Sequence, residues 1–169
     1  MGYVHDTQIS QFVSPFKVGF SAGTWTPTIA SNVPKNVRTA GAAAFTALIP
    51  IELPANVAGL KGARLKTIDV WYKILTADAT DFATVELEKL ALTANTVAIT
   101  GSAPAITFDS AHDTAAKRKA QAEHMLTVTL TTPVWIGAND VYYLELLVDC
   151  AATTVFTLFG TRCNYDLRV

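Results

Sequence analysis

The segment from residue 123 to residue 149 constrains the fold more than any other part of the chain. From Leu126 to Leu130, apolar residues alternate with threonine, which is the two-residue period of a strand with one buried and one solvated face. A second alternating run begins at Tyr142. Residues 137–140, Gly-Ala-Asn-Asp, lie between the two runs and include residue types that tolerate positive φ. The segment is therefore predicted to form a β-hairpin, from which the rest of the fold is built outward.

The same alternation predicts strands over most of the remaining chain. These further strands are expected at 42–53, 64–75, 82–93, 95–100, 103–108, 153–159 and 161–169. Gly101 and Ser102 are predicted to form a tight connection, and Gly160 is predicted to separate the last two strands. The polar stretch 109–121 lacks alternation, so a short helix or an ordered loop is expected there, with Asp113 or Thr114 as its cap.

About eight strands with short polar connections predict an all-β fold, an antiparallel β-sandwich made by residues 42–169. A jelly-roll type is favoured over an immunoglobulin-like fold, because eight strands is its number and the Cys, Trp, Cys framework is absent. In residues 1–41, Pro15, Pro27 and Pro34 interrupt any pattern, and an extended N-terminal arm is expected. Pro27 favours a sheet edge. The arm could cover the domain's own sheet edge or reach over a neighbouring subunit, and both alternatives stay open.

The composition favours contacts between subunits. Charged residues are only 16% of the chain and hydrophobic residues 50%, against a usual charged share of about 25%. Mean hydropathy is +0.29, yet the most apolar run, 42–60, is broken by Pro50, Glu52 and Pro54, so no membrane span is predicted. Subunit contacts better explain the surplus of apolar surface. A net charge of −1 provides no basic field of the kind that nucleic-acid binders use.

The first residues, MGYVHDTQ, lack the basic start and the apolar core of a signal peptide. Asp6 also breaks the myristoylation pattern that Gly2 could begin. We therefore expect the protein to be made in a cytoplasm and kept there until it assembles.

Cys150 and Cys163 fall on the apolar face of their strands, which favours buried reduced thiols over a disulfide. The chain shows no metal-binding spacing of cysteine or histidine. Neither a metal nor another cofactor is expected.

The chain contains no nucleophile elbow, P-loop, HExxH motif or glycine-rich dinucleotide turn. His112, Asp113, Glu123 and His124 flank one polar loop, where a metal site or an acid–base pair is conceivable. Hydrogen bonds within the loop are the favoured interpretation. The protein is expected to be non-enzymatic, with no catalytic residue.

Two acidic pairs also have an ordinary explanation. Glu86 and Glu88 lie on one strand face about 7 Å apart, which could serve glycoside hydrolysis, but outward acids on a strand commonly act as solubilising residues. Asp78 and Asp81 could hold calcium, but nothing like an EF-hand loop surrounds them, so turn chemistry is favoured.

The aromatic residues outside the predicted core are more informative. Trp71, Trp135 and Tyr143 are predicted to face outward from the sandwich, and Trp25 lies in the arm. Aromatic side chains anchor protein interfaces, and they also stack on sugar rings. Because the chain has so few charges, interfaces are favoured, and these four residues are the interface candidates.

The stretch HDTAAKRKAQAEHMLTVTLTTPVWIGANDVYYLELLVDCAATT, residues 112–154, resembles uncharacterised structural proteins encoded among the virion genes of tailed bacteriophages. The resemblance runs from about Leu65 to the end and includes the strands DVWYKI and VELEKLAL, the His-Asp-Thr loop and TPVWI. These are strand patterns, so no functional residue is carried over. The resemblance implies a jelly-roll virion component, such as a capsid decoration protein or a head or tail accessory protein.

The leading hypothesis is a non-enzymatic phage structural protein that forms a homo-oligomer, a trimer or a larger ring, and is located in the virion. Its partners would be its own copies and other virion proteins such as the major capsid or tail protein, without nucleic acid or membrane. The alternative is a glycan-binding module of a tail or cell-surface protein, with Trp71, Trp135 or Tyr143 as stacking platforms. A weaker third hypothesis is a hydrolase that uses Glu86 and Glu88.

Overall fold

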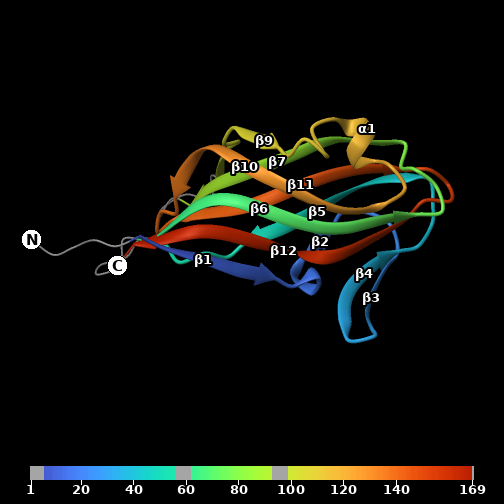
Figure 1. The fold of residues 1–169 in the computed structure, drawn as a ribbon, viewed down its shortest axis with the longest axis horizontal. Helices are drawn as coiled ribbons and strands as arrows, with labels where there is room; N and C mark the ends of the chain where they lie inside the picture. The colour runs from blue at the N-terminus through green and yellow to red at the C-terminus, as the bar shows by residue number, and fades with distance from the viewer. Residues whose placement is uncertain (1–5, 56–61, 93–98, 169) are drawn as a thin grey trace, which may run out of the picture.

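The computed structural model describes residues 6–55, 62–92 and 99–168 and shows an all-β sandwich of two packed antiparallel sheets (Figure 1). The large sheet contains β1 (Asp6–Val13), β3 (Trp25–Ala30), β4 (Val33–Arg38), β6 (Gly62–Leu75), β9 (Ile106–Phe108), β10 (Glu123–Trp135) and β12 (Val155–Arg168). The small sheet contains β2 (Gly19–Phe20), β5 (Ala43–Ile51), β7 (Asp81–Leu92), β8 (Ile99–Ser102) and β11 (Asp140–Cys150).

The strand order places the longest strands at the centre of each sheet. The large sheet has the order β3-β4-β12-β6-β10-β9, with β1 also paired to β12, and the small sheet has the order β2-β5-β11-β7-β8. Two short helices, η1 (Pro15–Lys17) and α1 (Ala115–Arg118), lie outside the sheets. Neither of these described helices has the length or the apolar character needed to cross a membrane.

The core lies between the sheets and is built from alternate residues of each strand, as the sequence pattern predicted. In β6 the buried inward side chains include Ile68, Val70, Tyr72 and Ile74. The Tyr72 ring stacks on Phe156 of β12 with centroids 5.3 Å apart. Each fully buried side chain of this size contributes roughly 1.5–3 kcal/mol relative to exposure, so the interleaved faces hold the two sheets together.

Residues 123–149 form two strands, as predicted, but the predicted hairpin is wrong. β10 pairs with β6 and β9 in the large sheet, whereas β11 pairs with β5 and β7 in the small sheet. Residues 137–140 therefore carry the chain from one sheet to the other, in a turn where the Asp140 amide donates to the Gly137 carbonyl oxygen at 3.1 Å. Alternation shows which side chains face the core, and it is the same whether consecutive strands pair or face each other across that core.

Two glycine-based predictions of strand ends are also wrong. Gly101 and Ser102 lie inside β8, and β8 and β9 belong to different sheets; positions 95–98 of the predicted strand lie outside the described residues. Gly160 does not separate two strands, because β12 continues through it with a register shift opposite Trp71. Gly160 has φ +134° and packs against Phe12, so glycine marks a bulge here and not a strand end.

The described part of the expected arm, residues 6–41, contributes strands to both sheets. β1 pairs with β12 along its whole length, β4 pairs with β12 further along the same edge, and β2 pairs with β5. The segment therefore covers sheet edges of its own chain. Pro27 lies in β3 at the edge of the large sheet, as predicted.

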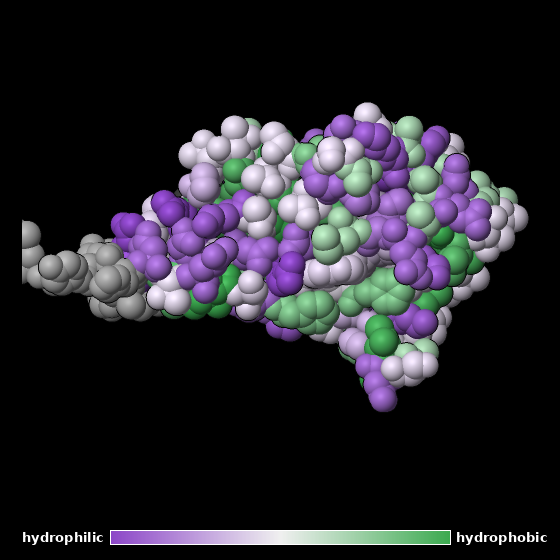
Figure 2. Space-filling view, viewed as in Figure 1, coloured by the Kyte–Doolittle hydropathy of each residue, from purple (hydrophilic) through white to green (hydrophobic). Residues whose placement is uncertain are grey.

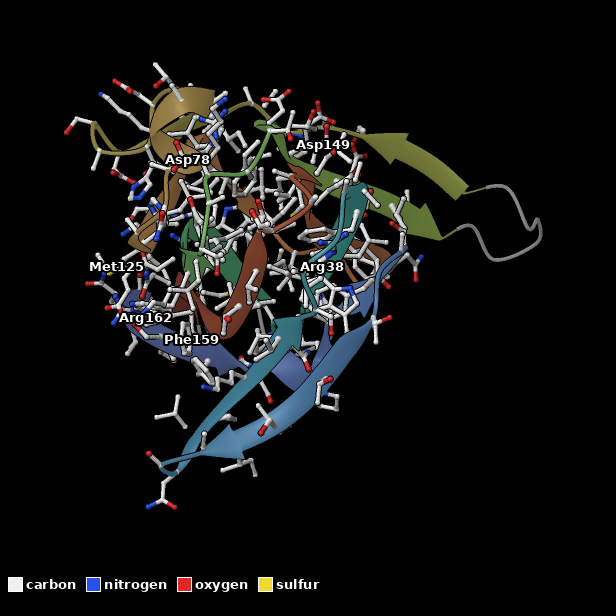
Figure 3. The ribbon with its side chains drawn as sticks, turned by 90° about the vertical axis from the view of Figure 1, so that its right-hand side faces the viewer. Arg38, Asp78, Met125, Asp149, Phe159 and Arg162 are labelled. Atoms are coloured by element: carbon white, nitrogen blue, oxygen red, sulfur yellow. The ribbon has the colours of Figure 1, made fainter. Side chains whose placement is uncertain are left out.

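β3 and β4 form a hairpin, here named the β3–β4 hairpin, that projects beyond the sandwich (Figures 1 and 3). Ser31 and Asn32 have positive φ values of 52° and 64°, the geometry of a two-residue turn that matches the twist of its strands. Only Asn36 to Arg38 pair with β12, so among the described residues the distal part, 28–35, has no other strand beside it.

Candidate functional site

The base of the β3–β4 hairpin is fixed by an aromatic cluster. The Trp25 ring stacks on Phe20 with centroids 3.6 Å apart, and it meets Phe45 at 4.9 Å and Phe156 at 6.3 Å in edge contacts. Its indole N–H donates to the Ala22 carbonyl oxygen at 2.8 Å. The structure thus places Trp25, one of the four interface candidates, in contacts within its own chain.

Arg38 closes the same base from β4. Its guanidinium is buried and donates to the carbonyl oxygens of Gly41 and Ala43, both at 3.0 Å, while it lies over the Phe45 ring at 5.4 Å. Gly23 has φ +87°, and a Cβ there would lie 2.7 Å from the Arg38 Nε. Glycine is therefore needed where the chain passes this guanidinium. These contacts hold the hairpin in one direction relative to the sandwich.

The tip of the β3–β4 hairpin carries apolar side chains into solvent. Ile29 is 67% exposed and Val33 is 44% exposed. Since β3 and β4 pair with Ala30 opposite Val33, the side chains of Val33 and Lys35 lie on one face of the hairpin and Ile29 lies on the other. Among the described residues, Lys35 makes no ion pair. A two-stranded ribbon is marginally stable alone in water, so a cover over this tip would stabilise it.

The outer face of the small sheet is acidic. In the described residues, its outward positions on β5, β7 and β11 carry five acids and neither lysine nor arginine. These acids are Asp81, Glu86, Glu88, Glu145 and Asp149. Glu145 stands opposite Glu86, and burial together with the charges of Glu86 and Glu88 raises the pKa of the Glu145 carboxyl. Tyr143, an interface candidate, lies half-buried on the same face opposite Glu88.

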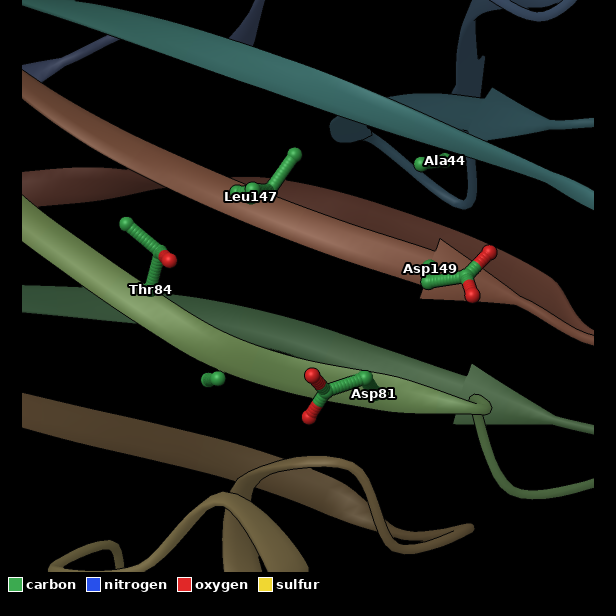
Figure 4. Close-up of a pocket in the computed structure, with 6 residues that line it drawn as sticks. Ala44, Asp81, Thr84, Leu147 and Asp149 are labelled. Carbon is green, nitrogen blue, oxygen red and sulfur yellow. The ribbon is translucent and has the colours of Figure 1, made fainter.

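A hollow of about 150 Å³, here named the β7–β11 hollow, opens on this acidic face (Figure 4). It is lined by Ala44, Asp81, Ala83, Thr84, Leu147 and Asp149. Leu147 is 38% exposed, and Asp149 follows two residues later on the same face of β11, opposite Asp81 of β7. The hollow therefore has an apolar half and a half with two carboxylates.

The outer face of the large sheet carries charges of both signs, which pair with one another. The carboxylate of Asp69 is buried and accepts the Thr127 hydroxyl at 2.8 Å, the Arg162 guanidinium at 2.7 and 3.0 Å, and the Asn164 amide at 3.0 Å. These partners come from β10 and β12, the two neighbours of β6. One buried carboxylate thus joins three strands.

A second ion-pair group lies further along the same face. Arg64 donates to Asp166 at 2.6 Å, Lys66 donates to the other oxygen of Asp166 at 3.2 Å, and Arg168 donates to Asp6 at 2.6 Å. The hydrogen bonds from these cations lower the pKa values of Asp6 and Asp166. Trp135, an interface candidate, lies here with the guanidinium carbons of Arg64 and Arg168 at 5.4 and 4.8 Å from its ring centroid.

The fourth interface candidate, Trp71, lines a groove of about 310 Å³ on the large sheet. The other lining residues are Tyr72, Glu123, His124 and Phe159. Arg162 lies over the Trp71 ring at 5.2 Å. Figure 3 shows Met125, Phe159 and Arg162 on this side of the molecule, and Figure 2 shows apolar patches interrupting its polar surface.

The polar loop before β10 holds a chain of one carboxylate and two imidazoles. Asp109 contacts His112 Nδ1 at 2.8 Å, His112 Nε2 lies 3.1 Å from His124 Nδ1, and His124 Nε2 lies 2.8 Å from the Ala120 carbonyl oxygen. The carboxylate and the carbonyl only accept, so all three contacts form together when one of the two imidazoles carries both ring protons. His124 stacks on Tyr72 at 4.6 Å, and burial, together with the charge of His112, lowers the pKa of His124.

The other candidate residues of this loop, Asp113 and Glu123, form ion pairs with nearby lysines. Asp113 pairs with Lys117 at 2.8 Å, and Glu123 pairs with Lys73 at 2.7 Å. Thr114, one of the two predicted caps, caps α1 by accepting the Lys117 amide at 3.4 Å. Within the described residues, no three His, Cys, Asp or Glu side chains gather as a metal site would require.

The remaining candidates have structural surroundings. Asp78 accepts the Gln121 amide at 2.7 Å, which ties the turn before β7 to the loop before β10. Cys150 and Cys163 are free and buried, as predicted. Burial, with the nearby Asp69 charge, raises the pKa of the Cys163 thiol to about 12, so this cysteine is not a reactive thiolate at neutral pH.

Two features were not identified from the sequence: the apolar hairpin tip and the β7–β11 hollow. Ser31 and Asn32, between Ile-Ala and Val-Pro, are a usable signal for a two-residue turn. The hollow has no comparable signal, because its lining comes from three strands that are far apart in the sequence.

No protein-family model matches this chain, and no curated protein matches it.

Proposed function

We propose that this protein is a non-enzymatic structural component that assembles with copies of itself in a tailed-phage virion. One observation carries the assembly proposal: the β3–β4 hairpin holds Ile29 and Val33 in solvent on a base that is fixed by packed aromatic rings. Apolar side chains held away from the core destabilise a lone subunit, and they contribute free energy when a partner covers them.

Further apolar side chains are exposed on both outer faces. Phe12 and Met125 are about half exposed on the large sheet, and Leu48 and Leu147 are exposed on the small sheet. With only 16% charged residues, the chain has several surfaces that could be covered in an assembly. The mechanism is burial of these surfaces between subunits, without a chemical step.

The virion part of the proposal comes from the resemblance of residues 112–154 to phage structural proteins. The jelly-roll type of sandwich belongs to the same proposal, as do the expected partners, a major capsid or tail protein. Peptides of this chain in the mass spectrum of purified phage particles, at a fixed ratio to the major capsid protein, are the expected result. Their absence from intact particles would contradict the virion assignment.

Native mass tests self-assembly directly. We expect light scattering during gel filtration to give a discrete trimer or larger ring whose mass is unchanged over a hundredfold dilution, because an interface of about 1,600 Å² suffices for stable association. A monomer at every concentration would contradict the proposal.

One observation favours the alternative, a glycan-binding module. The groove beside Trp71 combines an aromatic wall with the Glu123 carboxylate, which is the pairing that sugar rings and hydroxyls use. Glycan-array binding that is lost in Trp71→Ala or Trp135→Ala, by a protein that stays monomeric, would favour this function. Assembly without any glycan signal would exclude it.

A further inference from the structure

We propose that the β3–β4 hairpin of one copy docks on the β7–β11 hollow of a second copy, with Val33 against Leu147 and Lys35 facing Asp149 and Asp81. The inference rests on the proposed self-assembly and specifies its contact. It joins two described surfaces that have no partner within one chain.

The spacing of the two surfaces matches. Val33 and Lys35 are two residues apart on one face of β4, and Leu147 and Asp149 are two residues apart on one face of β11. Both separations are about 6.6 Å, the rise of two strand residues. An apolar side chain can therefore meet an apolar side chain while the ammonium meets a carboxylate. Ala44 and Ala83 leave the hollow of about 150 Å³ open for a branched side chain such as that of Val33.

The charges of the two surfaces are opposite. From residue 18 to residue 51 the chain contains no Asp or Glu, and its only cations are Lys35 and the buried Arg38. The outer face of the small sheet is the reverse, since its described outward positions carry five acids and no cation. The Lys35 ammonium is therefore attracted to this acidic face. The acidic faces of two copies, in contrast, repel each other.

The outer face of the large sheet fits the hairpin less well. Its two conspicuous carboxylates, Asp69 and Asp166, are already bonded to Arg162, Arg64 and Lys66. An incoming lysine would have to displace a guanidinium or an ammonium at either position. The carboxylates of Asp81 and Asp149 need no such exchange, because neither makes an ion pair among the described residues.

Each copy has one hairpin tip and one hollow, so the contact joins unlike surfaces and can repeat from copy to copy. Such a contact closes into a dimer or ring when the rotation allows, and otherwise continues as a chain. The hairpin's fixed base sets that rotation, because Trp25 and Arg38 hold its direction.

A charge exchange tests the contact. Lys35→Glu alone and Asp149→Lys alone should each weaken association at least about tenfold, measured by sedimentation velocity over a dilution series, because each places like charges together. The double variant carrying both changes should recover to within about threefold of the original protein, since the pair is restored in reverse. Single variants that weaken association without recovery in the double variant would overturn the proposed partner surface.

A matched pair at the tip separates this contact from a merely adhesive surface. Val33→Asp should abolish association, whereas Ile29→Asp should change it less than about threefold, because Ile29 lies on the other face of the hairpin. A non-specific apolar contact predicts the reverse order, since Ile29 is the more exposed residue. Circular dichroism and thermal unfolding of each variant verify that the sandwich is folded.

Mixing completes the test. Val33→Asp has a defective tip and Leu147→Asp has a defective hollow, so each should be monomeric alone, while their mixture should form heterodimers through the one intact tip and the one intact hollow. No association in the mixture would overturn the inference. If the original protein assembles and all of these variants assemble equally well, the docking mode alone is overturned. If the original protein is monomeric at every concentration, the proposed function is overturned as well.

Discussion

The two outer faces of the sandwich differ in how their charged side chains are paired. On the large sheet, Asp69 and Asp166 accept hydrogen bonds from arginine, lysine, threonine and asparagine of neighbouring strands. On the small sheet, Glu145 stands beside Glu86 and Glu88 with no cation on the described outward positions of that face. The first face is stabilised within one chain, and the second keeps unfavourable charges that a partner could neutralise. Local stability and availability for binding are therefore distributed to different faces of one fold.

The largest effect is expected at the centre of the paired face. Asp69→Ala should lower the free energy of unfolding by about 3 kcal/mol, because the donors on β10 and β12 lose their buried acceptor on β6. Urea denaturation measures it. The matched change on the other face, Asp149→Ala, should stay within about 0.5 kcal/mol of the original protein. An equal decrease in the free energy of unfolding for both variants would contradict this difference between the faces.

The second effect concerns the backbone of the same face. Gly160→Ala should cost about 2 kcal/mol, since φ is +134° there and the new methyl group would overlap the Phe12 ring and lie 3.0 Å from the Val13 carbonyl oxygen. Gly19→Ala, on the edge of the small sheet, has nothing within 4 Å of the new carbon and should cost less than about 1 kcal/mol. Thermal unfolding of both variants measures the two losses. A larger loss for Gly160→Ala is expected if the chain is packed more closely around Gly160 than around Gly19.

The third prediction tests the unfavourable charges of the small sheet. The raised pKa of Glu145 means that the folded state holds its proton more tightly than the unfolded chain does. Its ionisation therefore destabilises the fold above the folded pKa, and this cost disappears as pH falls through that pKa. Glu145→Gln should raise the free energy of unfolding by about 0.5 kcal/mol at pH 7 and should not raise it near pH 4.

A control for this prediction comes from the large sheet. The hydrogen bond from Lys73 lowers the pKa of Glu123, so Glu123→Gln should not raise stability at pH 7. A gain in both variants would mean that removing any acid stabilises this protein, whichever face carries it.

The smallest effect is local and has the opposite pH direction. The lowered pKa of His124 means that the unfolded loop binds its proton more readily than the folded loop, so stability is lost as pH falls below about 6.5. Hydrogen exchange corrected for intrinsic rates should show weaker protection of residues 109–124 at pH 5 than at pH 7. His124→Gln should remove this difference, and a difference that persists in the variant would assign it to another group.

The sequence predicted the sandwich, because burial on one face imposes the two-residue period that β6, β10 and β11 display. It also predicted the buried thiols of Cys150 and Cys163. The sequence pattern did not predict which strands pair. β10 and β11 are consecutive yet lie in different sheets, and alternation is the same whether they share a sheet or not. The jelly-roll subtype stays a prediction. Trp25 was predicted to be an interface residue because it is a tryptophan outside the predicted core. Residue type alone could not predict that the rings of Phe20 and Phe45 pack against it.

The pairing of β1 with β12 has a consequence for the order of folding. Asp6 and Arg168, whose side chains bond at 2.6 Å, are 162 positions apart in the chain. During synthesis, β1 leaves the ribosome before the other described strands and β12 leaves after them, so β1 waits for its pairing partner while those strands are made. Contacts between such distant segments close slowly. We therefore expect the small sheet and the β6–β10 pair to form early, and the first strand of the chain to be the last to dock.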